Sequence, residues 1–139
     1  TLALNGLIGA GVPQDWATHM IGHEITALHG LDHAQTLAIL LPTVLQEQRE
    51  KKSAKLLQYA ERVWGLNEGT DDTKINMAIT KTRDFFERMG VKTHLSDYQI
   101  NADAIPVMIK QLAEHGLTQL GEHNDIDLKK SQQILQASL

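Results

Sequence analysis

The sequence has 139 residues, which is enough for one compact domain and too few for two. Its net charge of −4, without a dense run of Lys or Arg, argues against nucleic acid or an anionic membrane as the main partner, and the absence of cysteine excludes disulfides and thiolate metal sites. No apolar run approaches the ~20 residues of a membrane span, and the N-terminus lacks the charged region of a signal peptide. We expect a cytoplasmic protein.

Apolar periodicity and the positions of glycine and proline predict an all-α fold, a multi-helix bundle of six or seven helices in a single domain over residues 1–139. The helices are expected at 1–9, 14–29, from 33 past 45, 54–64, from 70 or 71 to 89, 102–115 and 128–137. Pro13 is placed near the first turn of the second helix and Gly30 just after its end. Residues 91–100 read as a loop, and no strand is predicted.

Several side chains have expected local roles. Asp32, Ser53 and Asp127 are expected to cap the helices that follow them, and Pro42 lies inside one. The helix that starts near residue 70 is expected to bury one apolar face. That face consists of Ile75, Ala78, Ile79, Phe85, Phe86 and Met89.

Four of the seven histidines fall within fifteen residues, which is the least random feature of the sequence. His19 and His23 are four residues apart and so share one face of a helix, about 6 Å apart along its axis. In an unbroken helix His33 would lie about 21 Å from His19. The break at residues 30–32 lets the chain return, so that His33 can approach His19, whereas His29 points away from His23. Neutral imidazoles suit Zn²⁺, Fe²⁺ and Ni²⁺.

The residues alone leave a metal or catalytic role open beside an ordinary place on the surface or in the core. His23 and Glu24 resemble the start of the zinc-peptidase pattern HExxH, but residue 27 is Ala, so that motif is absent. A di-metal protein or phosphohydrolase would need paired Glu-x-x-His or His-Asp motifs, which the sequence also lacks.

The candidate metal site is short of ligands. A catalytic metal normally has at least three protein ligands, and His19 and His33 would supply two. The candidates for a third within the chain are Asp15, Glu24 and Asp32, each of which also suits a role as cap or surface charge. The remaining histidines are expected to be ordinary surface or helix-end residues: His94, His115 and His123.

The stretch from Gly11 to Ala34 resembles the second signature of the iron-type (group III) alcohol dehydrogenases. In that signature a histidine, a second one four residues on and a third ten residues later precede a helix with an apolar-apolar-Pro segment, here Ile39-Leu40-Leu41-Pro42. Segments at 54–60, 85–98 and 117–121 are similar to the branch of bacterial NADPH-dependent aldehyde reductases and butanol dehydrogenases. The resemblance covers essentially the whole chain.

The resemblance implies roles for three histidines. His19 and His33 match two metal ligands of the family, and His23 matches a catalytic histidine beside the nicotinamide and the substrate. The cofactors implied are a divalent metal, zinc or iron, and NADP(H). The family's other two ligands and its nucleotide-binding domain match nothing here, so we expect the chain to be the C-terminal helical metal-binding domain of a longer enzyme, starting inside a helix.

This resemblance predicts interconversion of aldehydes and primary alcohols by hydride transfer in a full-length enzyme, which is expected to be a homodimer. The isolated chain is expected to lack reductase activity. The alternative is a freestanding helical module that binds a metal or a partner without catalysis.

Overall fold

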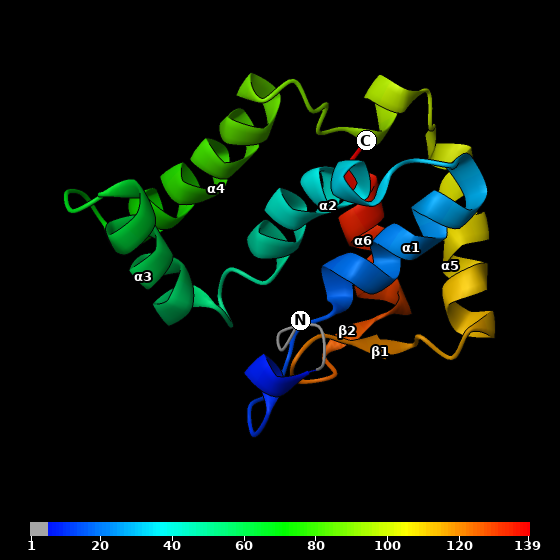
Figure 1. Cartoon of the computed structure of the whole chain (residues 1–139), viewed down its shortest axis with the longest axis horizontal. Helices are drawn as coiled ribbons and strands as arrows, with labels where there is room; N and C mark the ends of the chain where they lie inside the picture. The colour runs from blue at the N-terminus through cyan, green and yellow to red at the C-terminus, as the bar shows by residue number, and fades with distance from the viewer. Residues whose placement is uncertain (1–5) are drawn as a thin grey trace.

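The computed structural model describes residues 6–139, and this part of the chain is dominated by helices (Figure 1). The α-helices are α1 (Ala17–His29), α2 (His33–Glu47), α3 (Ser53–Trp64), α4 (Asp71–Arg88), α5 (Ile105–Glu114) and α6 (Leu128–Ala137). Single 3₁₀ turns occur at Leu7–Gly9, Leu95–Tyr98 and Ala102–Ala104. The all-α prediction is therefore confirmed. None of the described helices is long and apolar enough to cross a membrane.

Most helix ends are set by capping residues that can be recognised in the sequence. The Thr70 hydroxyl accepts a hydrogen bond from the Thr73 amide at 3.2 Å, and the Asp127 carboxylate accepts one from the Lys130 amide at 2.7 Å, so both residues are N-caps. Gly65 ends α3 in the left-handed region, at φ 65°. Ser53 is the first residue of α3 and not its cap, which is Lys52.

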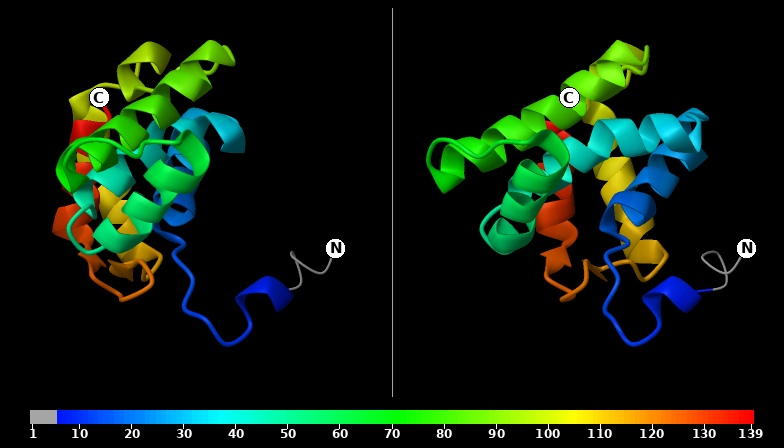
Figure 2. Two further views of the ribbon diagram at one scale, coloured as in Figure 1. Left: turned by 90° about the vertical axis from the view of Figure 1, so that its left-hand side faces the viewer. Right: turned by 60° about the vertical axis from the view of Figure 1, so that its left-hand side comes forward.

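The predicted boundaries differ from the structure near the N-terminus. Helix α1 begins at Ala17 and not at 14, because the Asp15 carboxylate accepts a hydrogen bond from the Ala17 amide at 2.9 Å and starts the helix there. Pro13 consequently lies outside it. Of the helix predicted at 1–9, residues 1–5 lie outside the described part of the chain, and Leu7–Gly9 form only a 3₁₀ turn. Figure 2 shows the described residues before α1 standing away from the helical body.

A small antiparallel sheet was not predicted. Strands β1 (Gln119–Leu120) and β2 (Ile126–Asp127) pair between α5 and α6, with Leu120 opposite Ile126. Both of these apolar side chains are buried. Two-residue strands are too short to show the alternation by which a strand is recognised in a sequence.

Two packed cores divide the helices. The main core lies among α1, α2, α5 and α6, and its fully buried side chains include Ile21, Ile25, Ile39, Leu40, Met108, Leu112, Ile134 and Leu135. Helices α3 and α4 form a hairpin at one side of this body (Figure 1), with a smaller core of Leu56, Ile75 and Ile79.

The predicted apolar face of α4 is only half correct. Ile75, Ala78 and Ile79 are buried, whereas Phe85 and Met89 are 43% and 63% exposed. Side chains of α3 contact α4 as far as Thr82, whose Oγ1 lies 2.6 Å from Tyr59 Oη, and Phe85 and Met89 lie beyond this contact.

Candidate metal centre

A close approach of α1 and α2 places the histidines of the two helices side by side. Gly30 ends α1 in the left-handed region at φ 69°, and its amide donates to the Thr26 carbonyl at 2.9 Å. Asp32 and Gln35 then form a capping box at the start of α2, in which the Asp32 amide donates to Gln35 Oε1 at 2.9 Å. The chain thus reverses within three residues, as the sequence predicts.

Gly22 is what allows the two helices to pack so closely. A Cβ atom at this position would lie 2.9 Å from Thr36 Oγ1 and 3.3 Å from Thr36 Cβ, both closer than ordinary contact. Gly22 lies between His19 and His23 in α1, and Thr36 is one turn after His33 in α2. The tight contact therefore lies within one helical turn of each of the three histidines.

The three imidazoles gather on the side of this contact that faces solvent. The ring centroids of His19 and His33 are 5.1 Å apart, and those of His23 and His33 are 5.8 Å apart. With metal–nitrogen bonds of about 2.0–2.1 Å and tetrahedral angles, two imidazoles on one ion have centroids about 5 Å apart. The donor types and the spacing of His19 and His33 thus fit a divalent cation such as zinc or iron.

His19 is suited to bind a metal because its neutral form is favoured. Partial burial lowers the pKa of His19 below its usual value, and the nearby His33 and His23, which are cationic when protonated, lower it further. A metal binds the unprotonated nitrogen of imidazole. Trp16 lies edge-on to His19, with centroids 5.1 Å apart, and limits the motion of that ring. Only its i, i+3 spacing from His19 could have indicated this contact.

No third ligand completes the site within residues 6–139, where no group of three or more His, Asp or Glu could hold one ion. The three predicted candidates are engaged elsewhere. The carboxylate of Asp15 pairs with Lys52 at 2.9 Å, Asp32 is part of the capping box, and Glu24 is buried against His115.

The other histidines differ in their surroundings. His29 is exposed at the end of α1, and His123 is exposed beside Glu122, as expected of surface residues. His115 is exposed at the C-terminal end of α5 and His94 precedes the 3₁₀ turn Leu95–Tyr98, as expected of surface or helix-end residues, but His115 also has a partner that was not predicted, because its Nδ1 lies 2.8 Å from Oε1 of the buried Glu24. Sequence spacing could not identify Glu24 as the partner of His115, since the two residues are 91 positions apart.

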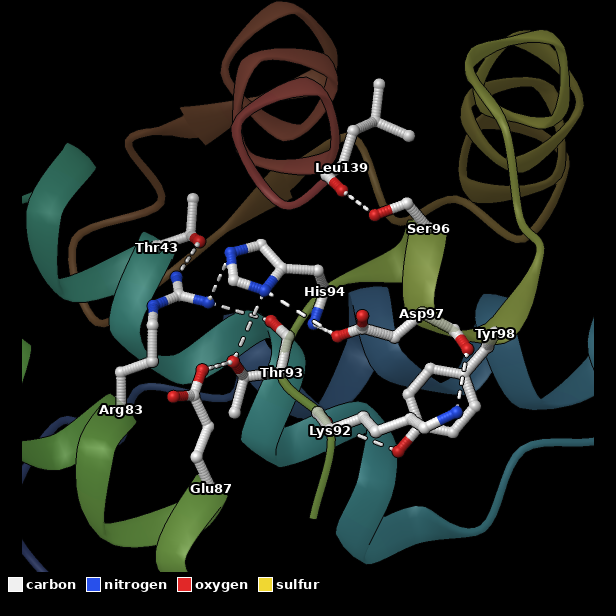
Figure 3. Close-up of polar contacts among 10 residues, drawn as sticks. All are labelled: Thr43, Arg83, Glu87, Lys92, Thr93, His94, Ser96, Asp97, Tyr98 and Leu139. Carbon is white, nitrogen blue, oxygen red and sulfur yellow. Dashed lines mark hydrogen bonds and ion pairs between the residues drawn. The ribbon is translucent and has the colours of Figure 1, made fainter. Parts of the chain in front are cut away.

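His94 belongs to a polar network around Arg83, shown in Figure 3. Arg83 donates from Nη1 to the Thr93 carbonyl at 2.8 Å and to His94 Nε2 at 3.2 Å, and from Nη2 to Thr43 Oγ1 at 3.4 Å. Burial lowers the pKa of the Arg83 guanidinium, and the nearby Glu87 carboxylate opposes that effect. The network joins α4 to α2 and to the loop after α4, so we interpret it as structural and not as part of the metal centre.

Comparisons with known proteins place this chain in a family. The model of the Fe-containing alcohol dehydrogenase family, C-terminal, matches residues 2–139. The chain is 64% identical over 138 residues to the NADPH-dependent aldehyde reductase YqhD of Escherichia coli (strain K12), covering 99% of this chain and 36% of that protein. It is 35% identical to the NADP-dependent alcohol dehydrogenase 3 of Entamoeba histolytica, covering 97% of this chain and 33% of that protein.

The fold comparison gives the same result. The crystal structure of YqhD from E. coli K-12 superimposes with a TM-score of 0.95, covering 100% of this chain and 36% of that one at 64% identity. The chain therefore spans about a third of the length of the relatives it matches. The family match over nearly all residues and the shared fold show that this chain belongs to the Fe-containing alcohol dehydrogenase family and corresponds to its C-terminal region.

Proposed function

We propose that this chain is the helical metal-binding part of a longer NADP(H)-dependent enzyme that interconverts aldehydes and primary alcohols. The observation that carries the proposal is the convergence of His19, His23 and His33 from two helices, in a chain 64% identical to an aldehyde reductase. His19 and His33 would hold a divalent cation, zinc or iron, and His23 would face the substrate and the nicotinamide.

Each histidine has a distinct task in this proposal. A cation held by His19 and His33 would act as a Lewis acid toward the aldehyde oxygen, and NADPH bound by the longer enzyme would supply the hydride. His19 stays neutral because its pKa is lowered, and so keeps a nitrogen lone pair available. The exposed His23 lies within reach of solvent protons and next to His33, so its ring nitrogen can hold the proton that the forming alcohol requires.

The missing ligands and the cofactor site would come from another part of the same polypeptide. Two histidines alone leave the coordination of a catalytic metal incomplete, and no further ligand joins them in the described residues. The proposal therefore includes an upstream domain that binds NADP(H) and contributes the remaining ligands. A homodimer in the cytoplasm is our expectation for that longer protein.

The first experiment measures metal content. Elemental analysis of the longer gene product is compared among the wild type, His19→Ala, His33→Ala and the control His29→Ala, which removes an exposed histidine at the end of the same helix. We expect His19→Ala and His33→Ala each to lose most of the bound metal and His29→Ala to retain it. Unchanged metal in both of the first two variants would rule out the ligand assignment.

The second experiment separates this proposal from a freestanding metal-binding or interaction module. NADPH oxidation with butanal is measured for the 139-residue chain and for the longer product. We expect turnover only from the longer product, and His23→Ala should lower kcat there while metal content stays unchanged. Equal turnover by the isolated chain would contradict the division of the active site between two parts.

A further inference from the structure

Glu24 is the only buried carboxylate among the side chains that the structure describes. It is 3% exposed, and it lies in α1 between His23 and the core residue Ile25. Burying a carboxylate is costly unless it is paired and hydrogen-bonded. A leucine would fill the same space without that cost. The carboxylate therefore indicates that this position needs a hydrogen bond, which an apolar side chain cannot make.

The hydrogen-bond partner of Glu24 is His115, at the end of α5. Its Nδ1 lies 2.8 Å from Glu24 Oε1, and its side chain is 57% exposed, so one edge of the ring faces the core and the other faces solvent. Glu24 Oε2 is buried and has no hydrogen-bond partner in the described part of the chain. The carboxylate is thus held by one directional contact, between the middle of α1 and the end of α5.

Helix geometry links this contact to the metal centre. At 100° per residue, Glu24 projects about 100° from His23 and about 140° from His19 around the axis of α1. A rotation of α1 by about 10° would move side-chain ends, which lie roughly 6 Å from the axis, by about 1 Å. The buried side chains of Ile21 and Ile25 hold α1 against the core, and the hydrogen bond of Glu24 adds a restraint whose direction is fixed. A hydrogen bond weakens when its geometry changes by that amount.

We infer that Glu24 and His115 are positioning residues for the metal centre. The hydrogen bond from His115 to the buried Glu24 carboxylate fixes the rotation of α1 about its axis, and so sets how His19 and His23 face His33. This inference deepens the proposed function and rests on it for the metal readout. Functional groups must be held to within ~0.5 Å and 10–20°, so a rotation of α1 that moves side-chain ends by about 1 Å would disturb the metal centre.

The test uses the longer gene product with three substitutions in the described residues. His115→Leu removes the donor, His115→Asn keeps an N–H at nearly the position of Nδ1, and Glu24→Met removes the acceptor at similar size. The control His123→Leu removes another exposed histidine beside a carboxylate. The readouts are the imidazole ¹H–¹⁵N signals of His19, His23 and His33 without metal, the Kd for Co²⁺ from its visible absorption, and the urea midpoint.

We expect His115→Leu and Glu24→Met to shift the imidazole signals of His19 and His23 and to weaken Co²⁺ binding by about tenfold, the lower end of the range for outer-shell residues. His115→Asn should restore both, and His123→Leu should change neither. A lower urea midpoint with unchanged imidazole signals would overturn the inference, because it would show a purely structural pair. Failure of His115→Asn to restore the signals would overturn it as well.

The two proposals fail in different ways. If His19→Ala leaves Co²⁺ binding unchanged, the metal assignment is wrong, while the metal-free imidazole signals of the Glu24 and His115 variants still test the positioning role. If His19→Ala abolishes binding but His115→Leu leaves the signals and the Kd unchanged, the metal assignment stands and the positioning pair is rejected.

Discussion

Replacing Gly22 with alanine tests whether the tight contact of α1 and α2 builds the metal centre. The added Cβ would lie 2.9 Å from Thr36 Oγ1, so the helices must separate or Thr36 must move until the distance reaches an ordinary contact of 3.4 Å or more. The required shift is about 0.5 Å at the contact. His33 lies one turn before Thr36, so the shift would be passed directly to the spacing of the imidazoles.

Two effects of opposite sign decide the stability of Gly22→Ala. Alanine gains about 1 kcal/mol over glycine within a helix, and overpacking a dense contact costs about 1–3 kcal/mol. We therefore expect a net loss of about 0–2 kcal/mol in the free energy of unfolding, together with weaker Co²⁺ binding because the His19–His33 separation changes. Urea unfolding and a Co²⁺ titration of the longer gene product measure the two quantities.

Thr36→Ala is the matched background for this experiment, because it removes the hydroxyl that the new Cβ would meet. Thr36 Oγ1 also donates to the His33 carbonyl at 2.9 Å, so the single variant measures that loss separately. In the double variant we expect part of the stability and of the Co²⁺ affinity to return, with a coupling of at least about 0.5 kcal/mol. A Gly22→Ala protein stabilised by about 1 kcal/mol in both backgrounds, with unchanged Co²⁺ affinity, would refute the reasoning.

Three further predictions concern the free energy of unfolding in urea. Thr70→Ala removes the N-cap of α4 and should cost about 1 kcal/mol, whereas Thr70→Ser should cost much less; equal losses would contradict the capping role. Arg83→Met leaves the carbonyl of the fully buried Thr93 without its donor and should cost about 1–3 kcal/mol, so a neutral result would show that the network in Figure 3 is dispensable. Lys52→Met breaks the pairs with Asp15 and Glu122, whose side chains are partly buried, and should cost about 1 kcal/mol; a loss of several kcal/mol would mean that Lys52 anchors the segment before α1.

Local signals in the sequence predicted most of the helices and the reversal that brings the histidines together. Helix ends are marked by Thr70, Gly65 and Asp127. Their contacts join residues only a few positions apart, so a sequence can indicate them. The approach of His33 to His19 was predicted for the same reason, since Gly30 and Asp32 set the turn locally.

Contacts between distant segments were not predictable in this way. The pairing of Glu24 with His115 depends on how α5 packs against α1, and the hydrophobic pattern of neither helix indicates it. The exposure of Phe85 and Met89 depends on where α3 contacts α4, although each residue lies at an apolar helical position. Both cases need the tertiary arrangement, because a single helix pattern shows only which residues share a face.

The three-residue turn between α1 and α2 has a consequence for folding and for metal-linked stability. His19 and His33 are only fourteen residues apart in the chain, so a cation bound to this pair alone would close a short loop whose ends already meet in the helical hairpin. Loop closure grows more costly only with the logarithm of loop length, and contacts this local form early in folding. Binding of a cation to these two histidines alone should therefore raise the free energy of unfolding only slightly. A large increase is expected only when a third ligand comes from a segment far away in the sequence.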